Sequence, residues 1–193
     1  IRELQINIDG GGISSTSNIF DVNPGADNVT IKGLAIYGNN DGAGVATWAN
    51  NTTIQCTNIG TDSEGLVSHA NQYGINVYNN GFVMTSGHIF GGPNPGDGNL
   101  VSGNNVTNSG NVFDGAGISG IGDDVLIQGN WIGVDITGQS ILANKSSGIN
   151  FGNGGSTLFT FDNVQILDNV VSGNGTTGNL NFSGGIVIGG SED

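Results

Sequence analysis

The chain has 193 residues, enough to bury one sizeable core, and combines 37 glycines with only 10% charged residues and a formal net charge of −13. Its basic residues, Arg2, Lys32 and Lys145, are too few for a phosphate-binding patch, and the acidic surface repels nucleic acid and anionic membranes, so both partners are excluded. No apolar stretch approaches the roughly 20 residues needed to span a bilayer, which excludes direct membrane insertion.

Short β-rich runs separated by glycine and asparagine turns recur along the chain. The runs are VTIKGLAIYGNN from Val29, TTIQCTNIG from Thr52, VLIQGNWIG from Val125 and VQILDNVVSGN from Val164. None has the 3.6-residue spacing of apolar positions that marks a helix. In the first run, alternation predicts that Val29, Ile31 and Ile36 point inward. Thr30 and Lys32 are predicted to point outward.

A second series places a glycine before an apolar residue, at intervals of about 30 to 43 residues. These glycines are Gly44, Gly74, Gly117, Gly148 and Gly185. A repeat in this range is typical of a solenoid, and each unit holds two or three short strands. Stacked units of this kind form a parallel β-helix, whose strands pair with equivalent strands of the next coil about 4.8 Å away. A β-sandwich, the competing all-β fold, does not predict repeated loop phrases.

Two types of coil alternate along this repeat. The phrase I-G-x-D-x-x-G occurs at 59–65 and again at 132–138, and the phrase S-G-N occurs in LVSGNN at 100–105 and in VVSGNG at 170–175. The succession of IGTDSEG, QYGINV and SGHIFGGPNPGDGNLVSGNN resembles the repeat of bacterial cell-surface right-handed parallel β-helix proteins. In that repeat, a GNYIGTDxxG-like phrase alternates with an IGGxxPGxGNxISGN-like phrase.

The resemblance runs from Val29 to Ile188. It departs at 56–58, where Cys-Thr-Asn replaces the Gly-Asn-aromatic phrase that 129–131 keeps. It implies a right-handed parallel β-helix and an extracellular or cell-surface location, but it carries little about activity. We therefore expect an all-β solenoid of about five or six coils, with residues 1–193 as a single domain. The chain begins without Met, so we expect it to be a mature product or, in the favoured interpretation, a segment of a longer extracellular protein.

The aspartates of the repeated phrase are Asp62 and Asp135, and Glu64 lies beside the first. Read functionally, the three are candidate ligands for Ca²⁺, which prefers oxygen donors and is the only candidate cofactor. Read structurally, each aspartate accepts backbone N–H groups in the turn that leaves a strand. Because Ca²⁺ needs six or more oxygens and each copy brings one or two carboxylates, the structural reading is favoured.

Asp123 and Asp124 are the best catalytic candidates. Polygalacturonase-like β-helix hydrolases use clustered carboxylates, including an adjacent Asp pair, as general acid and base. In that family a Gly-His-Gly phrase and an Arg-x-Lys phrase follow the pair, and neither follows Asp124 here. A turn at a coil junction is the favoured reading. A lyase reading, which relies on Lys or Arg, is disfavoured because the three cations are scattered.

Tyr37, Tyr73 and Tyr78 are candidate glycan-stacking residues, because aromatic rings stack on the apolar faces of sugars. In the alternative reading these tyrosines, like Trp48 and Trp131, fill corners of the coils. His69 and His88 lack triad-like neighbours and are predicted to be ordinary loop histidines.

The sequence thus favours a non-catalytic structural or adhesive module of a surface or secreted protein, in contact with glycans or assembled into a filament. Its expected partners are a polysaccharide, another cell-surface protein or a second copy stacked end to end. The alternative is a carbohydrate-active enzyme, a polysaccharide hydrolase or lyase, built on the same fold.

Overall fold

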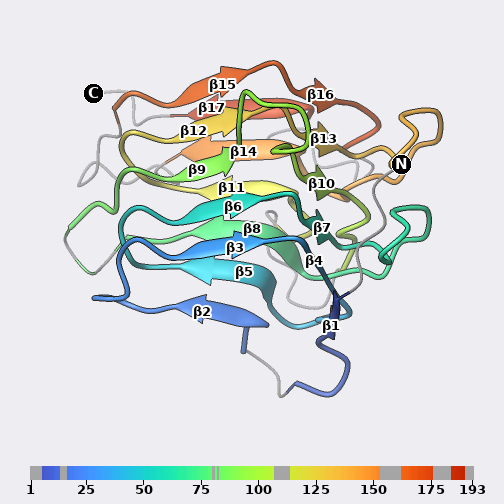
Figure 1. Ribbon diagram of the computed structural model, residues 1–193, viewed down its shortest axis with the longest axis horizontal. Coiled ribbons are helices and arrows are strands. Elements are labelled where there is room, and N and C mark those ends of the chain that lie inside the picture. The colour runs from blue at the N-terminus through green and yellow to red at the C-terminus, as the bar shows by residue number, and fades with distance from the viewer. Residues whose placement is uncertain are drawn as a thin grey trace.

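The protein is a solenoid of parallel strands (Figure 1). The structure, a computed structural model, describes residues 6–13, 17–79, 81, 83–106, 114–152, 162–175 and 184–189. These residues form 17 strands and no helix. Accordingly, no helix in the described ranges is long and apolar enough to cross a membrane.

The strands form three sheets, here named A, B and C, and every pair of neighbouring strands is parallel. Sheet A consists of β1 (Ile6–Asp9), β4 (Leu34–Tyr37), β7 (Asn58–Ile59), β10 (Leu100–Val101), β13 (Trp131–Ile132) and β16 (Val170–Val171). Sheet B consists of β2 (Phe20–Val22), β5 (Ala43–Thr47), β8 (Tyr73–Val77), β11 (Ile118–Gly120), β14 (Ile149–Gly152) and β17 (Ile186–Gly189). Sheet C consists of β3 (Thr30–Lys32), β6 (Thr53–Gln55), β9 (Ile89–Gly91), β12 (Leu126–Gln128) and β15 (Gln165–Leu167).

Along the chain the strands visit sheets A, B and C in strict rotation, so each coil contributes one strand to each sheet. Strands β1 to β15 make five such coils, and β16 and β17 begin a sixth. This confirms the expected all-β, right-handed parallel β-helix and its number of coils.

Columns of apolar side chains fill the interior, because equivalent residues of successive coils pair in register. In sheet C, for example, Ile31, Ile54, Phe90 and Ile127 stand one above the other, and each is buried. Burying one such side chain stabilises the fold by roughly 1.5–3 kcal/mol. The predicted alternation of 29–36 is confirmed: Ile31 and Ile36 are buried, Val29 packs against the core, and Thr30 and Lys32 are exposed.

An asparagine ladder, here named the A/B ladder, runs through the corner between sheets A and B. Its members are Asn39, Asn71, Asn104, Asn144 and Asn174. Asn104 is typical: its Nδ2 donates to Asn144 Oδ1 at 2.9 Å and to the Ile59 carbonyl at 3.3 Å, and its Oδ1 accepts from Asn71. The ladder thereby satisfies backbone N–H groups of its own asparagines, as Asn144 Oδ1 does for the N–H of Asn104 at 3.1 Å. It also adds a second donor to carbonyls such as that of Ile59, which already accepts from the N–H of Ser102.

The glycine series of the sequence lies against this ladder. A Cβ at Gly74 would lie 2.7 Å from Val101 and 2.9 Å from Nδ2 of Asn104. A Cβ at Gly117 would lie 2.8 Å from Nδ2 of Asn144. These glycines are therefore required by close approach, since a side chain there would displace the ladder.

The ladder also explains the two coil types. In the short type, a Gly-Asn pair follows the sheet A strand with at most one residue between them, as at Gly103 and Asn104, which follow Ser102. In the long type, a hairpin-like loop intervenes, bridged at Thr61 and Ser68 in one copy and at Val134 and Ile141 in the other. The same number of residues separates Ile59 from Asn71 and Ile132 from Asn144. The I-G-x-D-x-x-G phrase therefore begins a loop of constant length, and the asparagine that follows this loop is the next member of the ladder.

A second ladder, the C/A ladder, joins Asn99, Asn130 and Asn169 at the corner between sheets C and A. Thr57 takes the equivalent place in an earlier coil, where its backbone N–H donates to Asn99 Oδ1 at 3.1 Å. Its hydroxyl donates to the Gln55 carbonyl at 2.8 Å. The sequence of 56–58 thus departs from the repeat where this ladder ends, at a threonine in place of an asparagine.

Candidate ligand-binding groove

Asp123 and Asp124 occupy the outer corner between sheets B and C, here named the B/C corner. Every coil that crosses this corner in the described ranges places a residue pair there: Asp27–Asn28, Asn50–Asn51, Ser86–Gly87, Asp123–Asp124 and Asp162–Asn163. The second residue of each pair has a positive φ, which is 50° at Asp124 and 57° at Asn51. Its N–H donates to the carbonyl of the first residue one coil further on, as from Asp124 to Asp162 at 3.0 Å. Aspartate and asparagine tolerate this left-handed conformation better than most residues.

The side chains of Asp123 and Asn50 accept equivalent hydrogen bonds. Asp123 Oδ1 accepts the N–H of Asp162 at 2.8 Å, and Asn50 Oδ1 accepts the N–H of Ser86 at 3.0 Å. Asp124 Oδ1 accepts from Nδ2 of Asn163 at 2.9 Å. Because an amide replaces the carboxylate elsewhere in the series, acid–base chemistry is not what this position requires.

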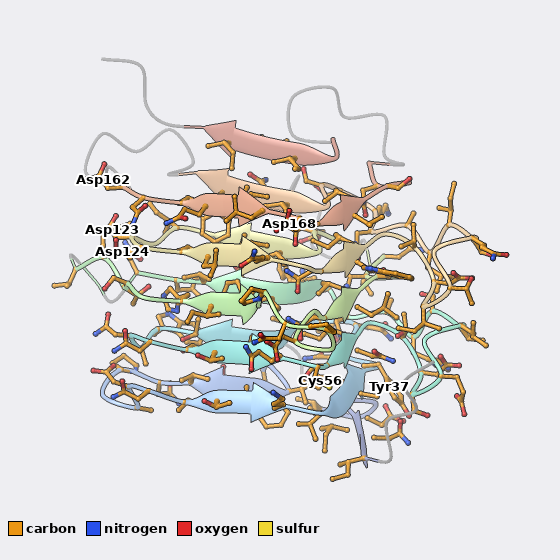
Figure 2. All side chains as sticks on the ribbon, turned by 45° about the horizontal axis from the view of Figure 1, so that its top comes forward. Tyr37, Cys56, Asp123, Asp124, Asp162 and Asp168 are labelled. Carbon is orange, nitrogen blue, oxygen red and sulfur yellow. The ribbon has the colours of Figure 1, made fainter. Side chains whose placement is uncertain are left out.

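The structure nevertheless brings a third carboxylate to the pair. Asp123, Asp124 and Asp162 lie at one edge of the stack (Figure 2). Asp124 and Asp162 are exposed and Asp123 is half-buried. Sequence reasoning missed Asp162, although VQILDN repeats the spacing of VLIQGN and so predicts that the two segments stack.

Asp62 and Asp135 each hold the turn of their own loop. Asp62 Oδ1 accepts the N–H groups of Leu66 at 2.9 Å and Val67 at 3.2 Å. Asp135 Oδ1 accepts from the Thr137 hydroxyl at 2.7 Å and from the N–H groups of Thr137 and Gln139. The hydrogen bond from the Thr137 side chain is the main reason that the pKa of the Asp135 carboxyl falls to about 2.

The two loops also contact each other across the short coil between them, where the Ile136 N–H donates to the Gly65 carbonyl at 2.9 Å. Glu64 is exposed, and its carboxylate accepts from the Ser63 hydroxyl at 3.3 Å. In the described ranges no group of three or more His, Cys, Asp or Glu side chains is arranged to hold a metal ion. The Ca²⁺ reading of Asp62, Glu64 and Asp135 stays a prediction.

Each of the three candidate tyrosines has a different side-chain neighbour. Tyr37 lies 5.1 Å, between ring centroids, from His69, and Tyr78 stacks on Trp48 at 4.4 Å with the rings nearly parallel. The Tyr73 hydroxyl donates to Asp114 at 2.9 Å, and burial, followed by this bond, raises the pKa of the phenol. All three are half-buried.

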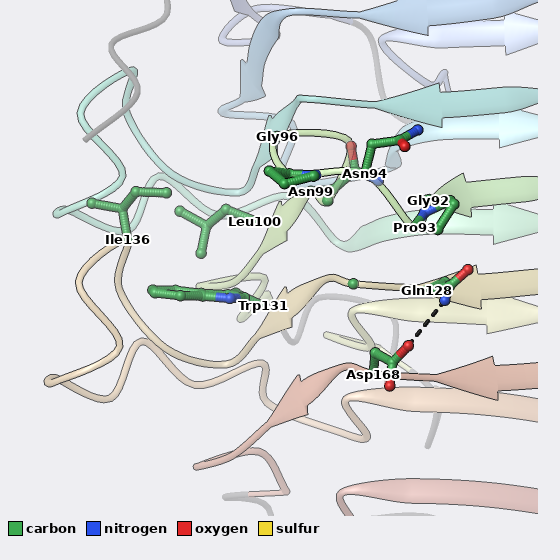
Figure 3. A pocket seen from close by; sticks show the side chains of 13 residues that line it. Gly92, Pro93, Asn94, Gly96, Asn99, Leu100, Gln128, Trp131, Ile136 and Asp168 are labelled. Carbon is green, nitrogen blue, oxygen red and sulfur yellow. Dashed lines mark hydrogen bonds between the residues drawn. The ribbon is translucent and has the colours of Figure 1, made fainter.

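A groove of about 430 Å³ opens at the corner between sheets C and A, and it is here named the Trp131 groove. Its lining residues include Asn94, Leu100, Gln128, Trp131 and Asp168 (Figure 3). They come from the loop after β9, from β10, from the segment joining β12 to β13, and from the turn after β15. Its volume is in the range of small-molecule sites.

The half-buried indole of Trp131 is the main apolar surface of this groove. Trp131 follows Asn130 of the C/A ladder, and its backbone N–H donates to the Asn99 carbonyl at 2.8 Å, so two ordered coils fix its position. Gly138 of the second long loop lies beside the ring, since a Cβ there would be 3.3 Å from Cζ3. The sequence around Trp131 does not predict that this aromatic residue, rather than another, lines a groove, because the walls of the groove come from neighbouring coils.

Cations are scattered in the described ranges. Lys32 lies 3.6 Å from Asp97 and donates to Gln55 Oε1, and Lys145 is half-buried in the stretch after Asn144. Arg2 lies outside the described residues. No lining residue of the Trp131 groove is a lysine or an arginine.

His88 lies in the loop directly before β9, as predicted, but it is not an ordinary exposed loop residue. Its side chain is fully buried and stacks on Phe90 with ring centroids 6.0 Å apart. Thr85 donates its hydroxyl to the Tyr78 carbonyl, so its oxygen accepts from Nε2 of His88 at 3.1 Å, and Nδ1 has no hydrogen-bond partner. Burial lowers the pKa of this imidazole to about 4.

Comparison with known proteins gives no match: no family model, no curated protein and no solved structure matches the chain significantly.

Proposed function

We propose that this protein is a non-catalytic structural or adhesive module of an extracellular or cell-surface protein, related to the bacterial β-helix repeat proteins that its phrases resemble. The observation that supports it most is the equivalence of Asp123–Asp124 with Asn50–Asn51 at the B/C corner. The best catalytic candidates of the sequence thus occupy a position that has a structural role in every described coil that crosses this corner. The two ladders and the corner form continuous hydrogen-bonded columns, as a stiff spacer requires.

A polysaccharide, another surface protein or a second copy of the chain are the partners of such a module. In the described ranges the sheets end on β1, β2 and β3 at one side and on β15, β16 and β17 at the other. Edge strands of this kind can pair with a further coil. A strictly monomeric mass in light scattering at every concentration would contradict end-to-end stacking.

A carbohydrate-active enzyme is the second candidate, and the gathering of Asp123, Asp124 and Asp162 at one corner favours it. Glycoside hydrolases use two carboxyl groups that flank the scissile bond. Against this candidate, Asp123 and Asp124 are already engaged by the N–H of Asp162 and the amide of Asn163.

Incubation of the purified chain with a panel of neutral and acidic polysaccharides separates the two candidates. Binding is scored by co-sedimentation, and cleavage by the release of reducing ends. We expect no cleavage by the wild type. The matched variant is Asp124→Asn, which keeps the acceptor for Asn163 and tolerates the positive φ but removes the acid. Release of oligosaccharides by the wild type that is lost in Asp124→Asn would overturn the proposal.

A further inference from the structure

The chemistry of the Trp131 groove identifies a class of ligand. We infer that it binds the apolar face of a neutral pyranose sugar within a glycan. This inference deepens the proposed function and rests on its adhesive form, because a purely structural spacer needs no ligand site. It moves the glycan contact from the tyrosines to a different residue, Trp131.

The shape of the groove fits one or two sugar rings. Its volume of about 430 Å³ lies between the second long loop, which contributes Ile136, and the loop after β9, which contributes residues 92–96. Trp131 is viewed edge-on in Figure 3, with Leu100 on one side of its plane and Asp168 on the other. Aromatic rings in such sites pack against the C–H groups of a sugar ring.

The polar side of the groove fits hydroxyl donors. Gln128 Nε2 donates to Asp168 Oδ2 at 3.0 Å, which fixes the amide and the carboxylate relative to each other. In the described ranges no hydrogen bond engages Oε1 of Gln128 or Oδ1 of Asp168. Both atoms are acceptors, and a carboxylate acceptor makes the stronger, charge-assisted bond to a hydroxyl.

The charge of the groove excludes acidic sugars. Asp168 is its only ionisable lining residue, and the whole chain carries a formal net charge of −13. A uronate would meet the Asp168 carboxylate with no lysine or arginine in the lining to offset it, whereas a neutral hexose meets only hydrogen-bonding groups. This sets the Trp131 groove apart from sites that recognise pectin-like polyanions.

The wall formed by the loop after β9 is fixed before any ligand arrives. Asp97 Oδ2 accepts from Nδ2 of Asn94 at 2.8 Å, and Asp97 also pairs with Lys32 at 3.6 Å. The hydrogen bond from the Asn94 side chain is the first cause that lowers the pKa of the Asp97 carboxyl. Pro93 and Pro95 further restrict the loop. A preformed wall reduces the entropy lost on binding.

The test is isothermal titration of the full chain with cellohexaose, mannohexaose and maltohexaose, and with trigalacturonate as the acidic probe. We expect at least one neutral hexaose to bind and trigalacturonate not to bind. Trp131→Ala should weaken that binding at least tenfold. Trp48→Ala, which removes the other tryptophan of the chain, should change it less than twofold.

A second variant, Asp168→Ala, tests the polar side independently should Trp131→Ala fail to fold, because Asp168 is exposed. We expect it to weaken binding threefold or more and, because Asp168 has a φ of 55°, to lower the melting temperature by a few degrees while the protein stays folded. Failure of every neutral hexaose to bind at millimolar concentration, or equal binding by a folded Trp131→Ala or Asp168→Ala protein, would overturn the inference. Neither result affects the non-catalytic proposal, which only cleavage of a polysaccharide would overturn.

Discussion

The A/B ladder and the B/C corner are both built from polar residues that recur in each coil, but the first is buried and the second is exposed. Asn104 is fully buried, and its amide bonds two neighbouring ladder asparagines and a main-chain carbonyl. Asp124 is exposed, and water can replace its bond to Asn163. Loss of a repeated polar residue therefore costs more free energy in the ladder than at the corner, because a buried group without a partner is not hydrated by water either.

The largest effect is expected where the buried ladder is broken. Asn104→Ala removes the donor to Ile59 and Asn144 and the acceptor for Asn71, all inside the corner. We expect the free energy of unfolding to fall by about 4 kcal/mol. One N–H of Asn71 Nδ2 is left without an acceptor, at a cost of about 1–3 kcal/mol. Two further hydrogen bonds of about 1 kcal/mol each are lost from Asn144 Oδ1 and the Ile59 carbonyl, which keep their other donors. Urea denaturation followed by circular dichroism measures the change. A loss below about 1 kcal/mol would show that the ladder contributes no more than an exposed corner.

His88 is buried in the segment that follows the exposed B/C corner. Its protonation therefore gives a second test of how much more a buried polar group matters than an exposed one. Its folded-state pKa, about 4, is below the ordinary value of 6.5, so the unfolded chain binds the proton more readily. Stability from this residue is therefore full above pH 6.5 and declines as the pH falls toward 4, by about 3 kcal/mol in total.

The measurement compares wild type with His88→Leu in urea titrations between pH 7.5 and 4.5. The difference in unfolding free energy between the two proteins should change across this range. His69→Leu is the matched control, because His69 is exposed, and it should leave the wild-type slope intact. A slope that survives in His88→Leu and disappears in His69→Leu would contradict the assignment.

The smallest effect is expected at the exposed corner. Asp124→Ala places a residue with no side-chain acceptor at a φ of 50°, and we expect a loss of about 1 kcal/mol. Asp124→Asn should stay within about 0.5 kcal/mol of the wild type, because Asn51 and Asn163 hold equivalent positions. Thermal unfolding of both variants measures this. Equal destabilisation by the two substitutions would mean that the carboxylate itself matters at this corner.

Much of the fold could be predicted from the sequence, since a solenoid repeats its local pattern once per coil. The glycine series, the alternation around Ile31 and the two copies of I-G-x-D-x-x-G each recur, and repetition makes them visible. The ladder asparagines recur too, but Asn71 and Asn144 follow a loop whereas Asn104 does not. Their common role is therefore hidden until the strands are in register.

The candidate site was less predictable for the same reason. The neighbours that make Trp131 part of a groove lie in other coils, and Asp162 and Asp123 meet only through stacking. The burial of His88 depends on which way one residue points at the start of β9, and a single isolated histidine carries no periodic signal.

By itself the sequence determined the parallel β-helix, its approximate number of coils and the alternation of long and short turns, because these depend on local propensity repeated at a regular spacing. Only the tertiary structure decided which polar residues are buried in ladders and which face water. It also decided that Trp131, and none of the tyrosines, lines the groove with a fixed amide–carboxylate pair. Those properties depend on contacts between coils, which join residues roughly 30 to 45 positions apart in a chain and leave no mark on any one segment.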